Sequence, residues 1–410
     1  MRRVVITGLG TISPVGNDVE TSWSNVLNGK SGIDRITSFD TSDLNIKIAG
    51  EVKNFNPTLF FNKKEQRIFP RFVQLSIAAT KEALADSNLK LEMKNPRVGC
   101  AIGVGIGCIG SITQTHKAFL NKGQKSVSPY FVPSVIANMA AGNTANYFKL
   151  HGPNICTTTA CTSGTHAISD AWFYIKNNIA DVMICGGSEA ALCELTVSGF
   201  ANMKALSKNN EKPREASRPF DKDRDGFVMS EGAGILILEE YEKARERGAK
   251  IYAELAGVGM SCDAHHITSP SPMGEGAQRC MTTALHSAFI DYQCIDYINA
   301  HGTSTRFNDF TESQAIREVF KSHADLLAVS STKGATGHCL GAAGGIEAVF
   351  LAKTIAEQIA PPTTNLVNPD PECTLDYIPG SKREMEIRYG LSNSFGFGGT
   401  NGSLILKRYT

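Results

Sequence analysis

One cysteine of the chain has the surroundings of a nucleophile. Cys161 lies in the stretch "TTTACTSGTHAI", where small neighbouring side chains would let a substrate come close. The residues that follow read as a helix, and the positive end of a helix dipole favours a thiolate. Backbone N–H groups of the turn could serve an oxyanion. The alternative is a structural cysteine, since free thiols are usually buried and the chain has eleven cysteines.

Two of the nine histidines stand at the ends of apolar runs. His301 follows "IDYINA", and His338 ends "STKGATGH", five residues after Lys333. Catalytic groups of α/β proteins lie where a buried strand gives way to such a glycine-containing turn. A satisfied core or loop histidine is the other interpretation for each. His265 and His266 are adjacent, and adjacent side chains rarely converge on one ion, so no metal site is predicted.

A thiol and two imidazoles together suit one kind of reaction. A Cys–His pair carries out acyl transfer, with the histidine accepting and donating the proton. Two neutral imidazoles can also stabilise the enolate-like charge that forms when a malonyl thioester loses CO₂. Attack of that enolate on an acyl-cysteine makes a carbon–carbon bond. The three residues therefore indicate a condensation of two thioesters.

The elements that must position these residues alternate along the chain. Runs rich in Val and Ile, such as "RRVVITG", "RVGCAIGVG", "ADVMICGG" and "AGILILEE", are apolar on both faces, as buried strands are. Helical patterns lie between such runs, over Phe72–Ser87, Gly164–Asn177 and Gly345–Glu357. This alternation predicts α/β layers around a mostly parallel sheet.

The length of the chain and a weak internal similarity predict two similar halves. A chain of 410 residues exceeds one ordinary core. Each half carries strands that end near a turn with candidate catalytic residues. We therefore expect an N-terminal half over 1–250 with the cysteine and a C-terminal half over 251–410 with the two histidines. No low-complexity linker separates them, and the active site should lie between them.

The composition narrows the partners and the compartment. The net charge is +1, which gives no global argument for nucleic acid or membrane binding, and no apolar stretch reaches the length of a membrane helix. The cysteines form no CxxC pair, which argues against a zinc knuckle. The opening "MRRVVITGLG" reads as a buried first strand rather than a signal peptide. We expect reduced thiols and a cytoplasmic protein.

Two further motifs resemble ligand sites without satisfying them. Gly105-x-Gly107-x-x-Gly110 follows a strand and fits a dinucleotide loop, but a lone match is weak, and tight turns beside a pocket explain it. "DKDRDG", residues 221–226, imitates a calcium loop, yet the twelfth position is Gly232, where a bidentate glutamate is required. A salt-bridged turn is the preferred interpretation.

Four motifs in order resemble the β-ketoacyl-[acyl-carrier-protein] synthases of the thiolase superfamily, most of all the synthase II group: "TTTACTSG", "NAHGTST", "STKGATGHCLGAAGG" and "SNSFGFGGTNGS". The likeness covers essentially the whole chain. It implies a thiolase-like fold, with duplicated α/β halves in a five-layered α-β-α-β-α architecture, usually as a homodimer. It also implies decarboxylative Claisen condensation of an acyl thioester with a malonyl-carrier protein in fatty acid elongation. No cofactor is expected, because phosphopantetheine arrives on the carrier protein.

The resemblance assigns roles to individual residues. It makes Cys161 the acyl acceptor, His301 and His338 the decarboxylating pair, Lys333 the support of the second histidine, and Phe397 a gate whose amide joins that of Cys161 in an oxyanion hole. The flanking glycines would let this gate move. Residues implied to bind substrate are Ile106 at the end of the acyl pocket, Thr268, Ser269, Thr303, Thr305, Phe395 and Gly398. Residues implied to order the shell behind the histidines, where the family allows a structural monovalent cation, are Asn299, Glu347 and Asn393.

Carrier-protein docking in the family uses basic residues against an acidic helix. The matching positions here are Lys63, Lys64, Arg67, Arg71, Lys125 and Lys204. Without the resemblance, the basic cluster in "NKKEQRIFPR" would read as a solvated surface. Ile68 and Ser126 stand where synthase II commonly has another basic residue, so the docking surface is expected to be weaker or tuned to another carrier.

One departure from the pattern keeps a second pathway open. After "HGTST" the fatty acid enzymes usually continue Pro-x-Gly-Asp, whereas this chain has Arg306, Phe307, Asn308 and Asp309. This run resembles the ketosynthase α subunit of type II polyketide systems, which pairs with a chain-length-factor homologue as a heterodimer. A degradative thiolase would need a second cysteine near "SNSFGFGG", and a non-catalytic partner subunit would lack Cys161, so both are less favoured.

Overall fold

A ten-stranded sheet runs through the computed structural model, which describes residues 2–92 and 94–410. Its strand order is β10-β9-β13-β14-β8-β1-β7-β6-β4-β5. In chain order the strands are β1 (Val4–Ile12), β4 (Val98–Gly103), β5 (Asn154–Ile155), β6 (Val182–Glu189), β7 (Gly232–Glu240), β8 (Ala253–Cys262), β9 (Tyr297–Asn299), β10 (Ala328–Ser330), β13 (Tyr389–Gly396) and β14 (Thr400–Arg408).

The sheet consists of two halves with the same topology. When the five strands of each half are numbered in chain order, they lie from the outer edge of the sheet inward in the order third, second, fourth, fifth, first. The first and fifth strands and the fifth and fourth are antiparallel, and the others are parallel, in both halves. The halves join where β1 meets β8 over two residue pairs. The structure thus shows the duplication that the sequence indicated only weakly.

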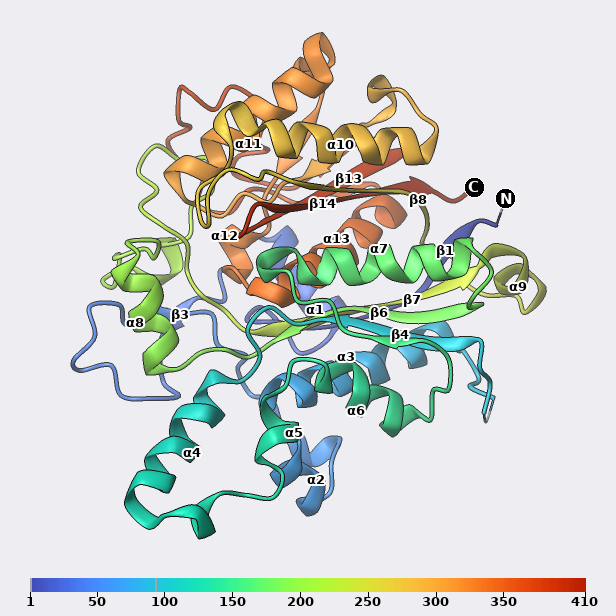
Figure 1. Cartoon of the computed structure of the whole chain (residues 1–410). Helices are drawn as coiled ribbons and strands as arrows, with labels where there is room; N and C mark the ends of the chain where they lie inside the picture. Colours follow the sequence, from blue (N-terminus) through green and yellow to red (C-terminus); the bar gives the residue numbers. More distant parts are fainter. Residues whose placement is uncertain (1, 93) are drawn as a thin grey trace.

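Helices complete five layers (Figure 1). α3 (Arg71–Ser87) and α6 (Met139–Phe148) cover the outer face of the N-terminal half, and α10 (Glu275–Ala288) and α11 (Arg306–Phe320) cover that of the C-terminal half. α7 (Ser163–Lys176) and α13 (Ala343–Glu357) lie between the two halves. Every residue of α13 up to Ile355 is buried, as expected of a helix that is apolar on all sides.

The three predicted helices are confirmed within two residues at each end, as α3, α7 and α13. The expectation of a mostly parallel sheet was wrong. β13 returns as β14 through a short turn, and β1, β7, β8 and β14 all run antiparallel to their neighbours. The apolar runs were correctly read as buried strands, but burial on both faces does not set the strand direction.

The middle layer shows the duplication most closely. A 3-10 helix, η3 (Ala160–Thr162), leads into α7, and another, η8 (Leu340–Ala342), leads into α13. The first residue of each has a positive φ, 51° at Ala160 and 49° at Leu340. The two turns are therefore built alike, although one carries a cysteine in the middle and the other Gly341.

The remaining elements lie outside this framework. Residue 250, where the N-terminal half was expected to end, lies in the connection between α9 (Tyr241–Glu246) and β8. Among the described residues, no helix is long and apolar enough to span a membrane. The other helices and strands are α1 (Val19–Leu27), β2 (Asp34–Arg35), β3 (Ile48–Ala49), α2 (Lys63–Ile68), α4 (Ile109–Lys122), α5 (Phe131–Val135), α8 (Glu194–Asn202), α9 (Tyr241–Glu246), α12 (Lys333–Thr336), β11 (Ile359–Ala360) and β12 (Arg383–Glu384).

Candidate active site

Cys161 lies at the tight turn before α7, between the two halves of the molecule. The turn is held by Ser163, whose hydroxyl donates to the carbonyl of Ala160 at 2.6 Å and accepts from the amide of Thr159 at 2.9 Å. Gly164 lies where α7 and α13 meet, and a Cβ there would stand 2.8 Å from the amide nitrogen of Gly345. The small residues after the cysteine therefore serve helix packing, in addition to any access for substrate.

His301 and His338 come together from two separate turns. His301 follows β9, and His338 follows β10 and α12. Their ring centroids lie 5.3 Å apart with the rings nearly perpendicular, and both side chains are buried. Phe395 packs against His301, and Phe227 packs against His338. The two parallel strands β9 and β10 thus bring to one place two residues that are 37 positions apart in the sequence.

Lys333 contacts the first histidine rather than the second. Its ammonium donates to the backbone carbonyl of His301 at 2.6 Å, lies 3.4 Å from His301 Nδ1, and forms a buried ion pair with Glu347. On His338 it acts through its charge. The support that the resemblance implied for the second histidine is therefore found at His301.

Both histidines are held neutral. Burial lowers the pKa of His301 well below its usual range, and the charge of Lys333 lowers it further. Burial and the Lys333 charge likewise depress the pKa of His338. Because an ammonium faces His301 Nδ1, that nitrogen is the acceptor and Nε2 carries the proton. A neutral ring of this kind offers one N–H group to an incoming oxygen.

The thiol of Cys161 is protonated in the resting site. Burial raises its pKa to about 12, and this outweighs the Lys333 ammonium and the backbone amides of Phe397 and Cys161, all of which lower it. Burial in the turn therefore counters the preference for a thiolate that the helix N-terminus gives. The same two amides meet at the sulfur, and they are the pair that the resemblance implied for an oxyanion hole.

Phe397 lies in the turn between β13 and β14, beside the cysteine. Gly398 and Gly399 follow it with φ angles of +83° and +73°, which favour glycine. The amide of Gly398 donates to the carbonyl of Ile267, and the amide of Asp263 donates to the carbonyl of Gly399, both at 2.8 Å. The Phe397 ring lies 6.3 Å from that of Phe200. The turn is thus fastened to the segment before α10 rather than hanging free.

One cavity of about 540 Å³ joins these groups. Cys161, His301 and His338 line it, as do most residues that the resemblance assigned to substrate: Ile106, Thr268, Ser269, Thr303, Thr305, Phe395 and Phe397. Gly398 does not line it, although its neighbours do. Lys333, Asn299, Glu347 and Asn393 lie behind the wall and are buried. Among the described residues, no group of His, Cys, Asp or Glu is arranged to hold a metal ion.

The loop from His301 to Phe307 leads from the interior to the surface. His301 and Thr303 are buried, Thr305 is half-buried, and Phe307 is 80% exposed. Thr303 Oγ1 and Thr305 Oγ1 lie 2.9 Å apart on the cavity wall. Arg306, Phe307 and Asn308 form part of the cavity rim, while Asp309 is buried and accepts from the amide of Phe220. The unusual run after "HGTST" therefore lies at the cavity mouth.

The sequence analysis missed a glutamate that shapes the His301 turn. Glu312, on the buried face of α11, accepts the amides of His301 and Gly302, each at 2.8 Å, and the side-chain amide of Asn393 at 3.2 Å. Asn393 in turn accepts from Ser403 Oγ at 2.7 Å. The available signal was a carboxylate eleven residues after His301, which a search for catalytic motifs passes over.

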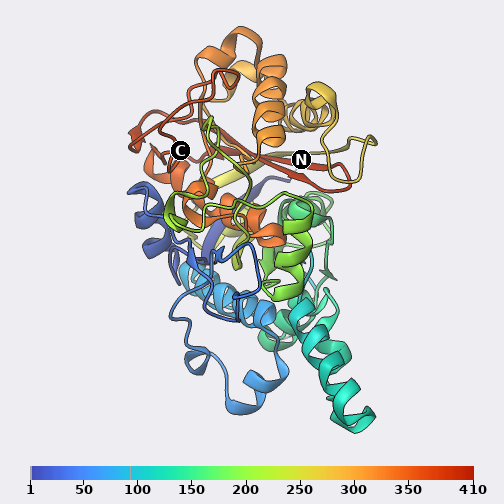
Figure 2. The same cartoon turned by 90° about the vertical axis from the view of Figure 1, so that its left-hand side faces the viewer.

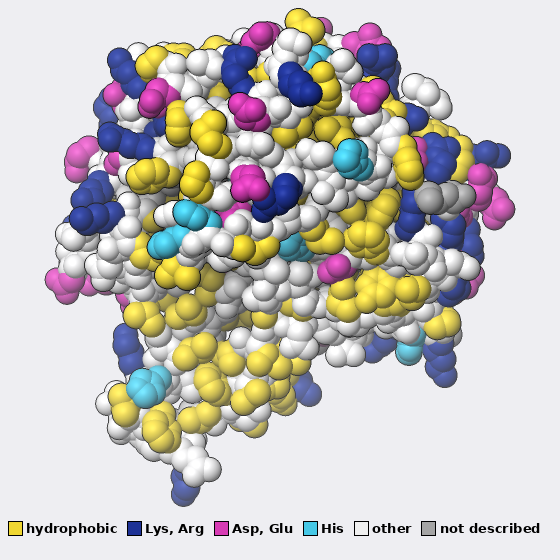
Figure 3. Space-filling view, turned by 45° about the horizontal axis from the view of Figure 1, so that its top comes forward, with side chains coloured by type: hydrophobic (Ala, Val, Ile, Leu, Met, Phe, Trp, Pro, Cys, Tyr) yellow, Lys and Arg dark blue, Asp and Glu magenta, His cyan; other side chains and the backbone are white. Residues whose placement is uncertain are grey.

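The basic residues implied for docking do not share one setting. Lys63, Lys64 and Arg67 are exposed on α2, and Lys125 is exposed after α4. Lys204 is exposed at the cavity mouth. Arg71 instead pairs with Glu231 through Nε and Nη2, at 2.6 and 2.7 Å, so its charge is neutralised within the chain. Figure 3 shows basic and acidic side chains interspersed over the face that it presents.

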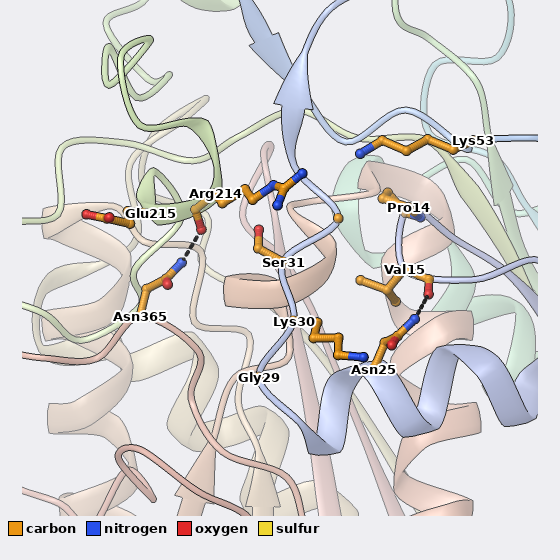
Figure 4. Close-up of a pocket in the computed structure, with 11 residues that line it drawn as sticks. Pro14, Val15, Asn25, Gly29, Lys30, Ser31, Lys53, Arg214, Glu215 and Asn365 are labelled. Atoms are coloured by element: carbon orange, nitrogen blue, oxygen red, sulfur yellow. Dashed lines mark hydrogen bonds between the residues drawn. The ribbon is translucent and has the colours of Figure 1, made fainter.

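A second cavity of about 470 Å³ lies apart from these residues (Figure 4). Lys30, Lys53 and Arg214 bring positive charge to it. Lys53 and Arg214 each lie 3.4 Å from Asp34, which offsets part of that charge. No cysteine or histidine lines it. It therefore lacks the thiol and the imidazoles that the first cavity brings together.

The "DKDRDG" segment is a salt-bridged turn, as predicted. Asp221 accepts the amides of Asp223, Val367 and Asn368, and Arg224 forms ion pairs with Asp370 and Asp309. This turn fastens residues 361–370, which follow β11, to the start of α11.

Comparison with known proteins identifies the family. The model for the N-terminal domain of beta-ketoacyl synthase matches residues 1–244, and that for the C-terminal domain matches residues 252–367. The chain is 50% identical over 409 residues to a Synechocystis protein named 3-oxoacyl-[acyl-carrier-protein] synthase 2, covering 100% of this chain and 98% of that one. A Coxiella burnetii protein of the same name is 50% identical, with 99% of each covered.

Solved structures agree with these matches. A beta-ketoacyl synthase from Burkholderia phymatum superposes with a TM-score of 0.94 at 34% identity, and the ishigamide ketosynthase/chain length factor with 0.94 at 33%. Each alignment covers the whole of both chains. The fold is therefore the thiolase-like fold that the resemblance implied, and the chain belongs to the beta-ketoacyl synthase family.

Proposed function

We propose that this chain is a 3-oxoacyl-[acyl-carrier-protein] synthase, which extends an acyl chain held on Cys161 with two carbons from a malonyl-carrier protein. The observation that carries the proposal is the shared cavity. It holds a thiol with two backbone amides at its sulfur and, beside it, two buried neutral imidazoles. The relatives at 50% identity bear the name of this activity.

The first step transfers the acyl group to the enzyme. The thiol of Cys161 attacks the carbonyl carbon of the acyl-carrier thioester, and the amides of Cys161 and Phe397 receive the negative charge on the carbonyl oxygen. Because the thiol is protonated at rest, its proton must leave as the new bond forms. The carrier's thiol departs with a proton, and the acyl group stays on Cys161.

The second step breaks a bond in the malonyl group. When CO₂ leaves, the thioester carbonyl becomes an enolate, and the N–H groups of His301 and His338 donate to its oxygen. Neutral rings suit this task, because each keeps one N–H donor. A charged imidazolium would instead lose its proton to the developing enolate. Lys333 contributes by keeping His301 neutral. The enolate carbon then attacks the acyl group on Cys161 and releases the thiol.

The buried oxygens behind the histidines fit a monovalent cation. Asn299 Oδ1, Ser392 Oγ and Glu347 Oε2 are buried without a hydrogen-bond partner among the described residues, and Asn299 pairs with Ser392 across β9 and β13. Oxygen donors of this kind suit a hard cation. Bound there, such an ion would neutralise the carboxylate that Lys333 shares, with Asn299 and Glu347 as its protein ligands.

The carrier protein is the expected partner. An acidic carrier helix would meet Lys63, Lys64 and Arg67 on α2, and Lys204 lies nearest the thiol, at the mouth through which the arm must pass. Electrostatic contacts of this kind steer association. Arg71 contributes little to docking, because Glu231 already neutralises it.

A second copy of the chain is the expected subunit partner. No residue of α4 is buried, and this helix extends away from the rest of the molecule (Figures 1 and 2). It and the following segment expose Ile112, Phe119, Leu120, Val132 and Ile136. An exposed apolar surface of this kind marks an interface. A homodimer is preferred to a pairing with a chain-length factor, because the relatives at 50% identity carry the fatty acid synthase name, whereas the polyketide ketosynthase structures are 33–34% identical.

Intact-mass spectrometry tests the proposal directly. The purified chain is incubated with hexanoyl-carrier protein and then with malonyl-carrier protein. We expect a hexanoyl adduct on Cys161, followed by its loss as a two-carbon-extended β-keto product on the carrier. Cys161→Ala should give no adduct and reduce condensation at least about a thousandfold, while malonyl decarboxylation continues. An adduct that is never extended would instead favour the heterodimeric polyketide role.

A further inference from the structure

A buried carboxylate next to the active site has no part in the mechanism above. Glu189 ends β6 and is completely buried. Its Oε2 accepts the amides of Gly105 and Ile106 at 2.9 Å and that of Gly341 at 3.2 Å, and its Oε1 accepts the amide of Gly107 at 2.7 Å. The glycine loop that resembled a dinucleotide site therefore does bind an anion with its backbone, but that anion is a side chain of the same protein.

Three elements of the site meet at this carboxylate. A Cβ on Gly105 would stand 2.7 Å from Glu189 Oε2, 3.1 Å from the carbonyl oxygen of Ala160 and 3.1 Å from the amide nitrogen of Gly341. Ala160 precedes the nucleophile, and Gly341 follows His338 by three residues. Glu189 thus ties the glycine turn to the turn that follows the second histidine, and Gly105 packs against the turn that carries the thiol.

The glycine turn also carries part of the acyl pocket. Ile106 lines the cavity, and it packs with Cys161 against the apolar cluster that contains Leu340. Its amide is one of the four that Glu189 accepts. Any shift of the turn therefore moves this side chain relative to the thiol, and with it the space left for an acyl chain.

We propose that Glu189 is a positioning residue that sets the acyl-chain selectivity of this site, because its carboxylate holds the turn of Gly105–Gly107, and with it Ile106, in place beside Cys161. This inference rests on the proposed condensing function. It assigns Glu189 no contact with substrate and no proton transfer.

The informative variant is Glu189→Gln. An amide in the same place can keep its oxygen toward Gly105, Ile106 and Gly341, but its NH₂ group then faces the amide N–H of Gly107, and two donors cannot pair. The loss of one charged hydrogen bond should release the turn at Gly107. Glu82→Gln is the matched control. Glu82 also accepts two backbone amides, those of Thr11 and Val19, and burial likewise raises its pKa to about 7. It lies on α3, and neither of its two partners lines the cavity, whereas Gly105 and Ile106 do.

The measurement compares kcat/KM for acylation by tetradecanoyl- and hexanoyl-carrier protein. The ratio between the two donors should change about tenfold or more in Glu189→Gln and stay at the wild-type value in Glu82→Gln. A folded Glu189→Gln enzyme with the wild-type ratio would overturn the inference and leave the proposed function standing. If the wild type were acylated by neither donor, the proposed function itself would fail.

The wild-type enzyme gives a second readout that needs no variant. Burial raises the pKa of Glu189 to about 7, against the four amides that lower it. The groups that feel its charge are the thiols of Cys156, Cys161 and Cys339, whose own pKa values are raised, and Lys333 faces Cys161. Below pH 7 the protonated carboxyl loses part of its hold, so the donor ratio should shift toward that of Glu189→Gln. Titrations that affect both donors equally cancel in the ratio. A ratio that stays constant from pH 6 to 8 would contradict the proposal.

Discussion

At the scale of single residues, the site is organised by one buried cation. Lys333 pairs with Glu347, donates to the carbonyl of His301, and lowers the pKa values of His301, His338 and Cys161. Breaking a buried ion pair leaves an uncompensated charge, which typically costs about 3–5 kcal/mol. The lysine therefore supports both the fold and the protonation states that the chemistry needs.

The first prediction follows from this role. In Lys333→Ala the pKa values of both histidines should rise, because the ammonium that disfavours their charged forms is gone. Each ring then becomes protonated at a higher pH and loses the neutral form that decarboxylation requires. The acid limb of the pH–rate profile for malonyl-carrier decarboxylation should move up by about one pH unit.

Lys353→Ala is the control for this experiment. Lys353 is also a largely buried lysine in ion pairs, with Glu20 and Glu357, but it lies on α13 away from the cavity. Its variant should lose stability without moving the acid limb. An unchanged acid limb in Lys333→Ala would show that burial alone keeps the histidines neutral.

At the scale of elements, the contact of α7 with α13 fixes where the nucleophile stands. Gly164→Ala would place a methyl group 2.8 Å from Gly345 N and 3.0 Å from Gly341 O, both backbone atoms that cannot turn aside. Overpacking of this kind costs about 1–3 kcal/mol. We expect a lower midpoint of denaturant unfolding and slower acylation of Cys161, since the turn that carries it must shift.

Gly199→Ala provides the comparison. Gly199 lies within α8, and a Cβ there meets nothing within 4 Å. The substitution should stabilise the helix by about 0.5–1 kcal/mol and leave acylation unchanged. Equal stability of the two variants would mean that α7 and α13 have room to separate.

Much of this arrangement could be predicted from the sequence, and the rest could not for definite reasons. Motifs placed Cys161, His301 and His338 at the ends of elements, and the structure brings them into one cavity. The effect of burial on the Cys161 thiol could not be predicted, because it depends on residues that pack around the thiol from distant parts of the sequence. Glu189 and Glu312 were missed, because a carboxylate that accepts backbone amides carries no motif. The strand directions in the sheet were missed as well, because apolarity does not encode them.

At the scale of the whole molecule, the projecting helix α4 is the feature that the single chain leaves unexplained. Phe119 and Leu120 are 46% and 68% exposed there. Phe119→Glu with Leu120→Glu should convert a dimer into monomers, as measured by sedimentation velocity, because each copy would bring two charges into the interface.

Phe289→Glu with Leu326→Glu is the matched change elsewhere. These residues are 79% and 77% exposed in the C-terminal half, and their replacement should leave the sedimentation coefficient unchanged. A wild-type chain that sediments as a monomer would remove the basis of the proposed homodimer. Equal effects of both double variants would indicate general destabilisation instead of a specific interface.

The paired turns of the middle layer have a consequence for the number of acyl groups that one chain can hold. Cys161 and Gly341 hold equivalent positions in the two repeats, each at the centre of a turn that opens with a positive φ and leads into a buried helix. In this chain the second place belongs to a glycine whose amide donates to Glu189, so each polypeptide has one position for an acyl group. The two halves thus share a fold and a turn, but only one of the two turns can carry an acyl group.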